Sequence, residues 1–290
     1  MNFKYLCQQY DLGRFLDASE LKPGTASRVW KMDTEGGVFL VRTLRDREQG
    51  EREGMIVRCL RAAGFDRCPA VLTTAQGAPM TALDGVWYQV QEYCPGTRPD
   101  PAAPGIAGAI ARTVKELTLS LAHCPFIDGA DRFDLAGAWQ RGKEYWPLLE
   151  TGMTLQQAEQ MVLRCCTILE QDVQVIHGDL GPWNMMVDGQ GAVSVIDFGE
   201  ARMGDPYFDY ASALGGIINH TGPEGRVSAC RGFLAVLDPD RDRLLEQLRL
   251  WVWRGLAQWA ILAGNGVPGA KMAARFINAL HWAEENLYDL

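Results

Sequence analysis

The segment VIHGDLGPWNMMVDGQGAVSVIDFGEA places two aspartates directly after runs of β-forming residues, which strongly constrains the local fold. Asp179 follows the first run and Asp197 follows the second. Between them, an Asp-Gly pair and the nearby Gly191 supply the positive φ that tight turns need. We therefore predict a β-hairpin from residues 185–187 and 192–196. Because a hairpin brings its two ends together, Asp179 and Asp197 are expected to lie close to each other.

Two neighbouring carboxylates require compensation, because repulsion and burial would otherwise raise their pKa values. Asn184, five positions after Asp179, adds a neutral oxygen donor to the pair. Two carboxylates and one amide oxygen suit Mg²⁺, a hard cation that keeps water or phosphate in its remaining positions. Taken singly, either aspartate is equally typical of a turn or a helix cap, so the prediction of a metal site depends on the combination.

Length and composition indicate a globular protein with one large domain or two lobes, since 47% of its 290 residues are hydrophobic and 22% are charged. The N-terminus lacks the pattern of a signal peptide, and the apolar stretch at 250–263 is interrupted and too short to span a bilayer. We expect a cytoplasmic protein that does not bind a membrane. The eight cysteines have no C-x-x-C spacing, which favours reduced thiols over disulfides or structural zinc.

Net negative charge is confined to the later part of the chain. Residues 1–94 carry 12 basic and 12 acidic side chains, so the net charge of −8 arises after residue 94. This balance argues against nucleic acid as a partner, because phosphate backbones require a basic face. An acidic second part would accommodate a cationic substrate, although acidic surfaces also simply keep proteins soluble.

A change in periodicity near Tyr93-Cys94-Pro95-Gly96 divides the chain into two predicted lobes, residues 1–94 and 95–290. The first lobe is predicted to form a small antiparallel sheet with one helix, at 47–63, and strands at 14–19, 27–32, 38–43, 70–74 and 86–93. The second lobe is predicted to be mainly helical, at 106–122, 135–149, 155–171, 207–219, 223–237, 241–263 and 269–287.

Two motifs in the second part resemble a known family. His177-Gly178-Asp179-Leu180 with Asn184, followed by Ile196-Asp197-Phe198-Gly199, is similar to the catalytic and metal-binding loops of the aminoglycoside phosphotransferase and choline kinase family, which are relatives of protein kinases. The similarity extends through Gly204-Asp205-Pro206 and Asp209-Tyr210-Ala211 and weakens in the late helices.

This resemblance implies an α+β, two-lobed protein-kinase-like fold that transfers the γ-phosphate of ATP or GTP to a hydroxyl of a small molecule. Asp179 would be the catalytic residue that accepts or orients the hydroxyl proton, and Asn184 and Asp197 would hold Mg²⁺ on the phosphates. His177, Asp205 and Asp209 are expected to brace the loop and cap the next helix rather than to react.

The first lobe would hold the nucleotide. Where protein kinases carry a strand lysine, this chain has Arg42, which keeps the charge and can bind phosphate through two donors. Its acidic partner is assigned to Glu53, which is in phase with the apolar face of the predicted helix, with Glu51 as the alternative. A pseudokinase that binds nucleotide without turnover remains the opposing interpretation, and the arginine is the one sign in its favour.

Two further segments are expected to contact the nucleotide. No G-x-G-x-x-G motif is present, and after the turn at Lys22-Pro23-Gly24 the segment Gly24-Thr25-Ala26-Ser27-Arg28 takes its place. Ser27 and nearby backbone amides would contact phosphate. The hinge that contains Gln91 and Tyr93 would offer backbone groups to the base.

The acceptor pocket is predicted in the late helices, because the chain has no recognisable peptide-docking segment. Aromatic and acidic side chains gather there: Trp251, Trp253, Trp259, Trp282, Glu246, Glu284 and Glu285. Together they would suit an amine-bearing acceptor such as an aminoglycoside antibiotic, while homoserine, choline or an amino sugar would use the same catalytic loop. The same residues are equally typical of a helical core and a solvated surface.

Overall fold

The computed structural model describes residues 2–21, 27–128, 131 and 134–290, and the chain forms two compact units. Unit 1 comprises Met1–Thr97, Leu119–Cys124 and Met186–Gly199, and unit 2 comprises Arg98–Thr118, Pro125–Met185 and Glu200–Leu290. Unit 1 therefore includes two segments that follow residue 94, and the lobe boundary at that residue stays a prediction. The predicted turn at residues 22–26 lies outside the described residues.

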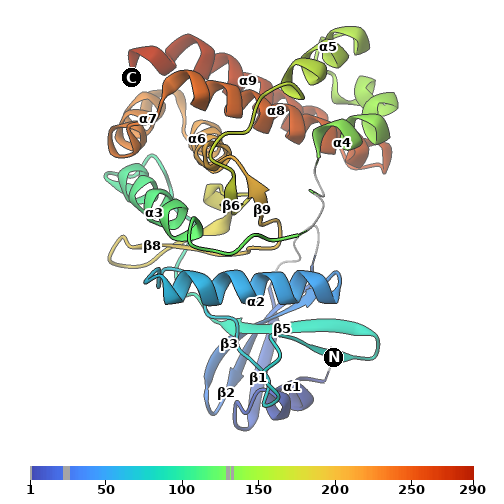
Figure 1. The fold of residues 1–290 in the computed structure, drawn as a ribbon, viewed down its shortest axis with the longest axis vertical. Coiled ribbons are helices and arrows are strands. Elements are labelled where there is room, and N and C mark those ends of the chain that lie inside the picture. Colours follow the sequence, from blue (N-terminus) through green and yellow to red (C-terminus); the bar gives the residue numbers. More distant parts are fainter. Residues whose placement is uncertain (1, 22–26, 129–130, 132–133) are drawn as a thin grey trace. The chain divides into compact units, whose positions relative to one another are not determined.

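Unit 1 is built on a five-stranded antiparallel sheet in the order β1-β2-β3-β5-β4. Figure 1 labels four of these strands, β1, β2, β3 and β5. The strands are β1 Phe15–Glu20, β2 Val29–Thr34, β3 Gly37–Leu44, β4 Thr81–Leu83 and β5 Val86–Glu92. Four of the five predicted strands are confirmed. The segment predicted at 70–74 forms only an isolated bridge from Val71 to Gln91, and β4 was not predicted.

Two helices accompany this sheet, so the prediction of a single helix in the first lobe is wrong in this detail. The predicted helix is α2, Arg47–Ala62, and the additional helix is α1, Phe3–Gln9. Asn2 caps α1 by accepting a bond from the backbone N–H of Tyr5 at 3.1 Å. Leu6 and Cys7 of α1 are buried in a core cluster with Trp30, Met32, Val41 and Val90. Burial of this face stabilises a helix too short to persist alone.

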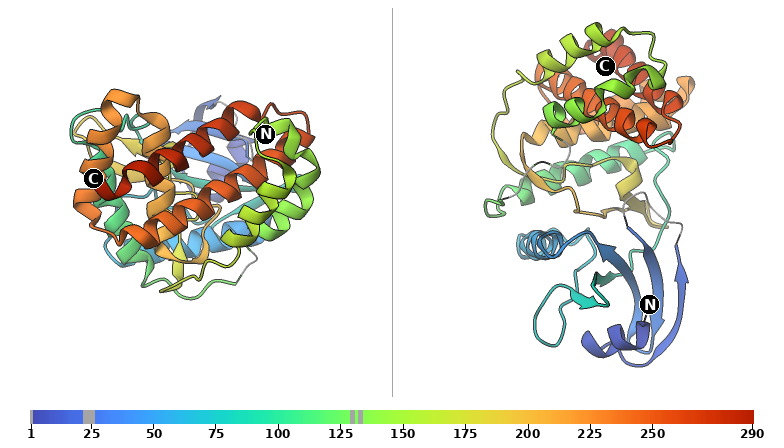
Figure 2. Two further views of the ribbon diagram at one scale, coloured as in Figure 1. Left: turned by 90° about the horizontal axis from the view of Figure 1, so that it is seen from above. Right: turned by 90° about the vertical axis from the view of Figure 1, so that its right-hand side faces the viewer.

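The helices of unit 2 begin with most of α3 and follow the predicted order: α3 Ile106–Leu121, α4 Leu135–Gly142, α5 Leu155–Cys165, α6 Pro206–His220, α7 Pro223–Leu237, α8 Arg241–Gly264 and α9 Ala270–Asn286. Short 3-10 turns complete them: η1 Lys143–Leu149, η2 Pro182–Asn184 and η3 Leu287–Asp289. Helices α8 and α9 run side by side in the view from above (Figure 2). The ring of Trp253 in α8 stacks on that of Trp146, with centroids 5.7 Å apart, so Trp253 belongs to the core.

Two predicted helices are shorter than their sequence patterns indicated. The pattern at 135–149 becomes α4 and then η1, because Pro147 lacks an N–H and cannot continue the α-helical hydrogen bonds. The pattern at 155–171 ends with α5 at Cys165. There the hydroxyl of Thr167 donates to the backbone oxygen of Arg164 at 2.7 Å, which satisfies the end of the helix locally.

Short strands hold the loops that carry the predicted site. In unit 2, β6 Gln174–Ile176 pairs antiparallel with β9 Arg202–Gly204. The predicted hairpin is confirmed as β7 Met185–Val187 and β8 Val193–Val195. Its turn is closed by Asp188, which accepts bonds from the backbone N–H groups of Gln190 at 2.8 Å and Ala192 at 2.9 Å.

All eight cysteines are free thiols. Burial raises the pKa of Cys68, Cys165 and Cys230 to about 12, so these three thiols are protonated and unreactive near neutral pH. In the part of the chain that the structure describes, no helix combines the length and hydropathy of a membrane span.

Candidate active site

Asp179 lies in the loop of unit 2 between β6 and η2, and two side chains orient its carboxylate. The amide nitrogen of Asn184 donates to Asp179 Oδ2 at 2.8 Å and to the Asp179 backbone oxygen at 2.9 Å. The indole Nε1 of Trp183 donates to Asp179 Oδ1 at 3.1 Å. A carboxylate has about four acceptor sites, so these bonds fix its direction and preserve its capacity to accept from a hydroxyl. The structure thus brings the predicted Asp179 and Asn184 together.

His177 and Asp209 hold this loop on α6, as predicted. Asp209 Oδ2 accepts from the backbone N–H of His177 at 2.7 Å, and Oδ1 accepts from that of Gly178 at 2.9 Å. Burial raises the pKa of Asp209, while His177 and these two bonds oppose the shift. Gly178 has a φ of +79°, and a side chain there would meet the backbone oxygen of Glu200, so glycine is required.

Asp205 supports the same region from the start of α6. It is the N-cap residue, and its Oδ1 accepts from the backbone N–H of Tyr207 at 2.9 Å. Arg243 of α8 donates to both oxygens of Asp205, at 2.7 and 3.2 Å. The predicted capping and bracing roles of Asp205 and Asp209 are therefore confirmed by their hydrogen bonds.

Arg42 connects two predicted site residues within unit 1. Its Nη2 donates to Glu53 Oε1 at 2.5 Å, and its Nη1 donates to Asp197 Oδ1 at 2.8 Å. Glu53 is fully buried, and burial raises its pKa while the Arg42 guanidinium opposes that shift. Because Glu51 pairs instead with Arg47 on the surface, the assignment of Glu53 as the partner of Arg42 is confirmed.

Gln49 is a part of this cluster that the sequence analysis missed. Its Nε2 donates to Glu53 Oε1 at 2.8 Å, one helical turn before Glu53. The spacing of four residues on a predicted helix was the available signal. The contact of Trp183 with Asp179 in unit 2 was also not predicted, although the place of Trp183 inside the Asp-x-x-x-x-Asn motif could have indicated it.

A cavity of about 190 Å³, here called the sheet cavity, collects most of the residues predicted to bind nucleotide. Ser27, Arg42, Gln91 and Tyr93 line it, whereas Glu53 does not, and the predicted metal ligand Asp197 lines it as well. Its apolar walls come from the sheet and from the hairpin segment: Val29, Leu40, Met186 and Ile196. Strand β5 ends at Glu92, so the backbone leaves the sheet ladder at the edge of this cavity. Apolar walls with a few polar groups are typical of small-ligand sites.

Asp197 is placed to present its carboxylate beyond this cluster. Its backbone has a φ of +63°, which aspartate tolerates better than most residues, and its side chain is 49% exposed. Oδ1 accepts from Arg42 and, at 3.3 Å, from the backbone N–H of Gly199. A Cβ at position 199 would come within 2.9 Å of Gln49 Nε2, so glycine allows this close approach.

The donor chemistry of the predicted metal ligands fits Mg²⁺. Asp197 offers a half-exposed carboxylate, and the amide of Asn184 offers its oxygen because its nitrogen already donates to Asp179. Both are hard oxygen donors. Asp197 belongs to unit 1 and Asn184 to unit 2, and their convergence on one ion stays a prediction. Within the described residues, no group of three or more His, Cys, Asp or Glu side chains forms a separate metal site.

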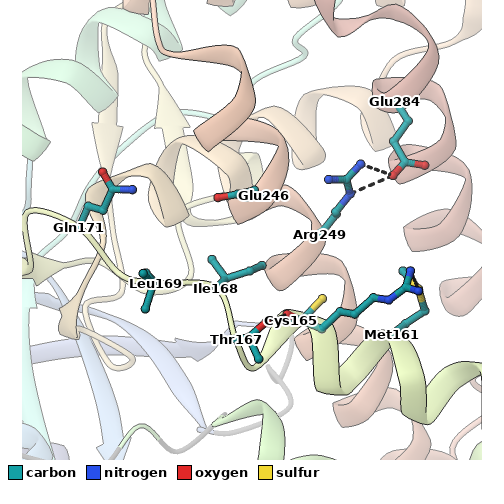
Figure 3. Close-up of a pocket in the computed structure, with 10 residues that line it drawn as sticks. Met161, Cys165, Thr167, Ile168, Leu169, Gln171, Glu246, Arg249 and Glu284 are labelled. Atoms are coloured by element: carbon teal, nitrogen blue, oxygen red, sulfur yellow. Dashed lines mark hydrogen bonds and ion pairs between the residues drawn. The ribbon is translucent and has the colours of Figure 1, made fainter.

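Three of the residues predicted to form a single acceptor pocket line two different cavities of unit 2, and a fourth, Trp253, lies in the core. Trp251 lines a cavity of about 320 Å³, here called the aromatic cavity, together with Trp183, His220, Met272, Arg275 and Phe276. Glu246 and Glu284 line another cavity, of about 710 Å³, where Glu284 pairs with Arg249 at 2.9 Å (Figure 3). Among the cavities described here, Trp251 therefore does not share a lining with Glu246 and Glu284, and a single acceptor pocket of tryptophans and glutamates stays a prediction.

Comparisons with known proteins agree with this architecture. A family model described as a phosphotransferase enzyme family matches residues 17–259. No curated protein sequence matches the chain significantly.

Solved structures similar to this chain include three enzymes in complex with ligands. Amicoumacin kinase hAmiN, with AMP-PNP, Ca²⁺ and Ami, has a TM-score of 0.71 at 14% identity, covering 96% of this chain and 91% of its own. A thermostable mutant of aminoglycoside phosphotransferase APH(4)-Ia, in complex with ADP and hygromycin B, has a TM-score of 0.66 at 18% identity, and the match covers 96% of this chain and 97% of its own. Spectinomycin phosphotransferase APH(9)-Ia, in complex with ADP and spectinomycin, has a TM-score of 0.60 at 12% identity, and the match covers 98% of this chain and 93% of its own. These likenesses show a shared kinase-like fold.

Proposed function

The chain belongs to the phosphotransferase enzyme family, and from this premise we propose that it transfers the γ-phosphate of ATP or GTP to a hydroxyl of a small-molecule acceptor. One observation carries the proposal. Arg42 joins the buried Glu53 to the half-exposed Asp197 in the wall of the sheet cavity, which Ser27, Gln91 and Tyr93 also line. This arrangement places a fixed cation and a carboxylate beside an apolar cavity, as a nucleoside triphosphate requires.

In the proposed reaction, Asp179 orients the acceptor hydroxyl and takes its proton. The hydroxyl oxygen forms a bond to the γ-phosphorus, the bond from that phosphorus to the bridging oxygen breaks, and the nucleoside diphosphate leaves with the electron pair. Trp183 and Asn184 hold the carboxylate in one orientation throughout, because each donates to one of its oxygens. The protein thus supplies position and charge rather than a covalent intermediate.

Asn184 and Asp197 are the residues that would hold Mg²⁺. When bound, the ion would neutralise charge on the phosphates and on the leaving diphosphate. Arg42 would add a fixed positive charge on the unit 1 side and keep Asp197 in place through the bond at 2.8 Å.

Two alternatives to this proposal differ in what supports them. An amine-bearing acceptor such as an aminoglycoside was predicted from tryptophans and glutamates, and Trp251 lines a different cavity from Glu246 and Glu284. Its support is the net charge of −8 and the structural likeness to enzymes in complex with hygromycin B and spectinomycin. A pseudokinase was suggested by arginine in place of lysine at position 42. Arg42 nevertheless pairs with Glu53 as the lysine of a kinase would pair with its glutamate, so the substitution alone does not favour an idle protein.

An activity assay tests the proposal through Asp179→Asn, which keeps the shape of the side chain and removes its capacity to take a proton. Purified protein with Mg²⁺ and γ-labelled ATP or GTP is expected to transfer label slowly to water and faster to an acceptor. Asp179→Asn should lower turnover by about 10²–10⁴-fold with nucleotide affinity unchanged. Asp84→Asn, in an exposed turn, is the matched control. Tight nucleotide binding without turnover in the unmodified protein would contradict the proposal.

A further inference from the structure

The aromatic cavity adjoins the proposed catalytic carboxylate through one shared residue. Trp183 forms part of the cavity lining, and its indole N–H donates to Asp179 Oδ1 at 3.1 Å. Trp183 and Asp179 both belong to unit 2, so this neighbourhood is internal to one compact unit. If the proposed function holds, a molecule in this cavity lies one side chain, that of Trp183, away from the residue that accepts its hydroxyl proton. The chemistry of the cavity therefore bears on the acceptor.

Aromatic rings form much of the cavity wall. Trp183 and Trp251 are nearly parallel, with an interplanar angle of 17° and centroids 6.5 Å apart. Phe276 lies 4.8 Å from Trp251, and His220 lies 6.1 Å from Trp183, measured between ring centroids. Flat rings present their faces and edges to a ligand, and they favour another flat ring through stacked or edge contacts.

Two consecutive glycines in α6 allow the tryptophans to occupy these positions. A Cβ at Gly215 would come within 2.4 Å of the Trp251 ring, and one at Gly216 would come within 2.3 Å of Pro182 and 3.1 Å of the Trp183 ring. Both distances from Cβ to ring lie below ordinary van der Waals contact. The sequence therefore keeps side chains off this helix face, and the rings pack directly against its backbone.

The charge of the described lining is positive. Arg275 and His220 are its titratable side chains, and no aspartate or glutamate lines this cavity among the residues described. Arg275 Nη2 donates to the backbone oxygen of Asn219 at 2.8 Å, which fixes the guanidinium on the wall. A guanidinium has five N–H donors in a planar fork that matches a carboxylate. A polycation placed here would meet Arg275, and no acidic side chain of the described lining would compensate for the repulsion.

We infer that the acceptor is a flat aromatic hydroxy compound that bears a carboxylate, rather than a polycationic amino sugar. The inference rests on the proposed function and specifies its substrate class. The aromatic part would lie against Trp183, which is partly exposed, and against the small exposed part of Trp251, and the carboxylate would face Arg275. The hydroxyl would then point toward Asp179, on the side where the indole N–H of Trp183 already contacts that carboxylate.

Two probes that share a ring and a hydroxyl test this inference. Indole-3-lactate carries a hydroxyl and a carboxylate on an indole side chain, and tryptophanol carries a hydroxyl and an ammonium group on the same ring. Their affinities are measured by thermal shift and calorimetry without nucleotide, and their kcat and KM as acceptors with Mg²⁺ and ATP or GTP. We expect indole-3-lactate to bind at least about tenfold more tightly, because a bidentate guanidinium–carboxylate pair forms with one probe alone.

Variants of α9 residues test whether Arg275 causes the preference for indole-3-lactate. Arg275→Gln should remove the preference, so that the two probes bind within about threefold of each other, and Arg275→Lys should restore part of it. Lys271→Gln removes a positive charge from an exposed position one turn earlier on the same helix and should leave the preference unchanged. A preference for tryptophanol or hygromycin B, an absence of binding by both probes, or an unchanged ratio in Arg275→Gln would overturn the inference.

Failure of this inference is distinguishable from failure of the proposed function. Nucleotide binding and hydrolysis are measured with no acceptor present, and they test the sheet cavity and Asp179. Probe binding is measured with no nucleotide, and it tests the aromatic cavity. An enzyme that hydrolyses nucleotide and prefers the cationic probe keeps the proposed function and overturns this inference.

Discussion

Arg42 forms ion pairs with two carboxylates that differ in their exposure to solvent. Glu53 is buried on one side, and Asp197 is half exposed on the other. Removal of a buried partner leaves an uncompensated charge, which costs more than an intact buried pair contributes. The arginine that departs from the kinase pattern is thus required by the acids around it.

The first prediction concerns Arg42→Met, which we expect to destabilise the protein by about 3–5 kcal/mol, since Glu53 would lose its buried partner. Urea unfolding measures the change. The loss should shrink as the pH falls, because burial raises the pKa of Glu53 and removal of Arg42 removes the cation that opposes this shift, so that protonation of Glu53 relieves the unpaired charge in the folded state.

Arg47→Met is the matched control for this experiment. Its pair with Glu51 has the same arginine–glutamate chemistry at 2.7 Å, but the two side chains are 67% and 50% exposed. Exposed pairs contribute at most about 1 kcal/mol. If both variants lost the same stability, or if the loss at Arg42 did not depend on pH, the account of this cluster would be incorrect.

Among the elements, α2 positions the cluster and depends on how it begins. Asp46 is its N-cap residue, and Asp46 Oδ1 accepts from the backbone N–H of Gln49 at 2.7 Å. Two glycines on the inner face allow close packing, because a Cβ at Gly50 would meet Leu44 and one at Gly54 would meet Pro79, both within 2.6 Å. The start and the inner face of α2 together set the position of Gln49 and Glu53.

The second prediction concerns the N-cap of α2. We expect Asp46→Ala to destabilise the protein by about 1 kcal/mol at neutral pH, because the bond from the Gln49 N–H is lost. The bond from Gln49 N–H lowers the pKa of Asp46, so its stabilising contribution is complete above the unfolded pKa and is lost as the pH falls through the folded pKa. Unfolding free energies at neutral and acidic pH measure this dependence. Asp46→Asn can still cap the helix but has no titratable group, so its free energy of unfolding should be close to that of the unmodified protein at neutral pH. A loss of stability in Asp46→Ala that did not depend on pH would contradict the assignment of Asp46 as the N-cap.

Most elements were predictable from the sequence because their periodicity is strong, and the exceptions have local or tertiary causes. Helix α1 has seven residues and depends on burial of Leu6 and Cys7 against the sheet, which no local pattern reveals. Pro147 and Thr167 end helical patterns through one missing donor and one side-chain bond. Periodicity alone predicts that the helix continues past such positions, because the hydrophobic spacing does not change there.

At the scale of the whole molecule, the motif residues were predictable and their partners were less so. Asp179, Asn184, Arg42 and Glu53 follow from spacing and from the resemblance. Arg42 pairs with Glu53 as expected, and Asn184 lies against Asp179, although its hydrogen bond to that carboxylate was not predicted. Trp183 and Gln49 act through contacts that spacing merely suggests. The acceptor region could not be predicted, because tryptophans at helical spacing enter both the core and a cavity: Trp253 stacks on Trp146, while Trp251 lines the aromatic cavity.

The central claim is that Asp197 of unit 1 and Asn184 of unit 2 bind one metal ion on the nucleotide. A crystal structure of the chain with Mg²⁺ and AMP-PNP tests it most directly. We predict an ion with an oxygen of each side chain and phosphate oxygens in its coordination sphere, at about 2.0–2.1 Å. An ion bound by AMP-PNP with either side chain far outside coordination distance, or the two side chains in separate surroundings, would contradict the claim.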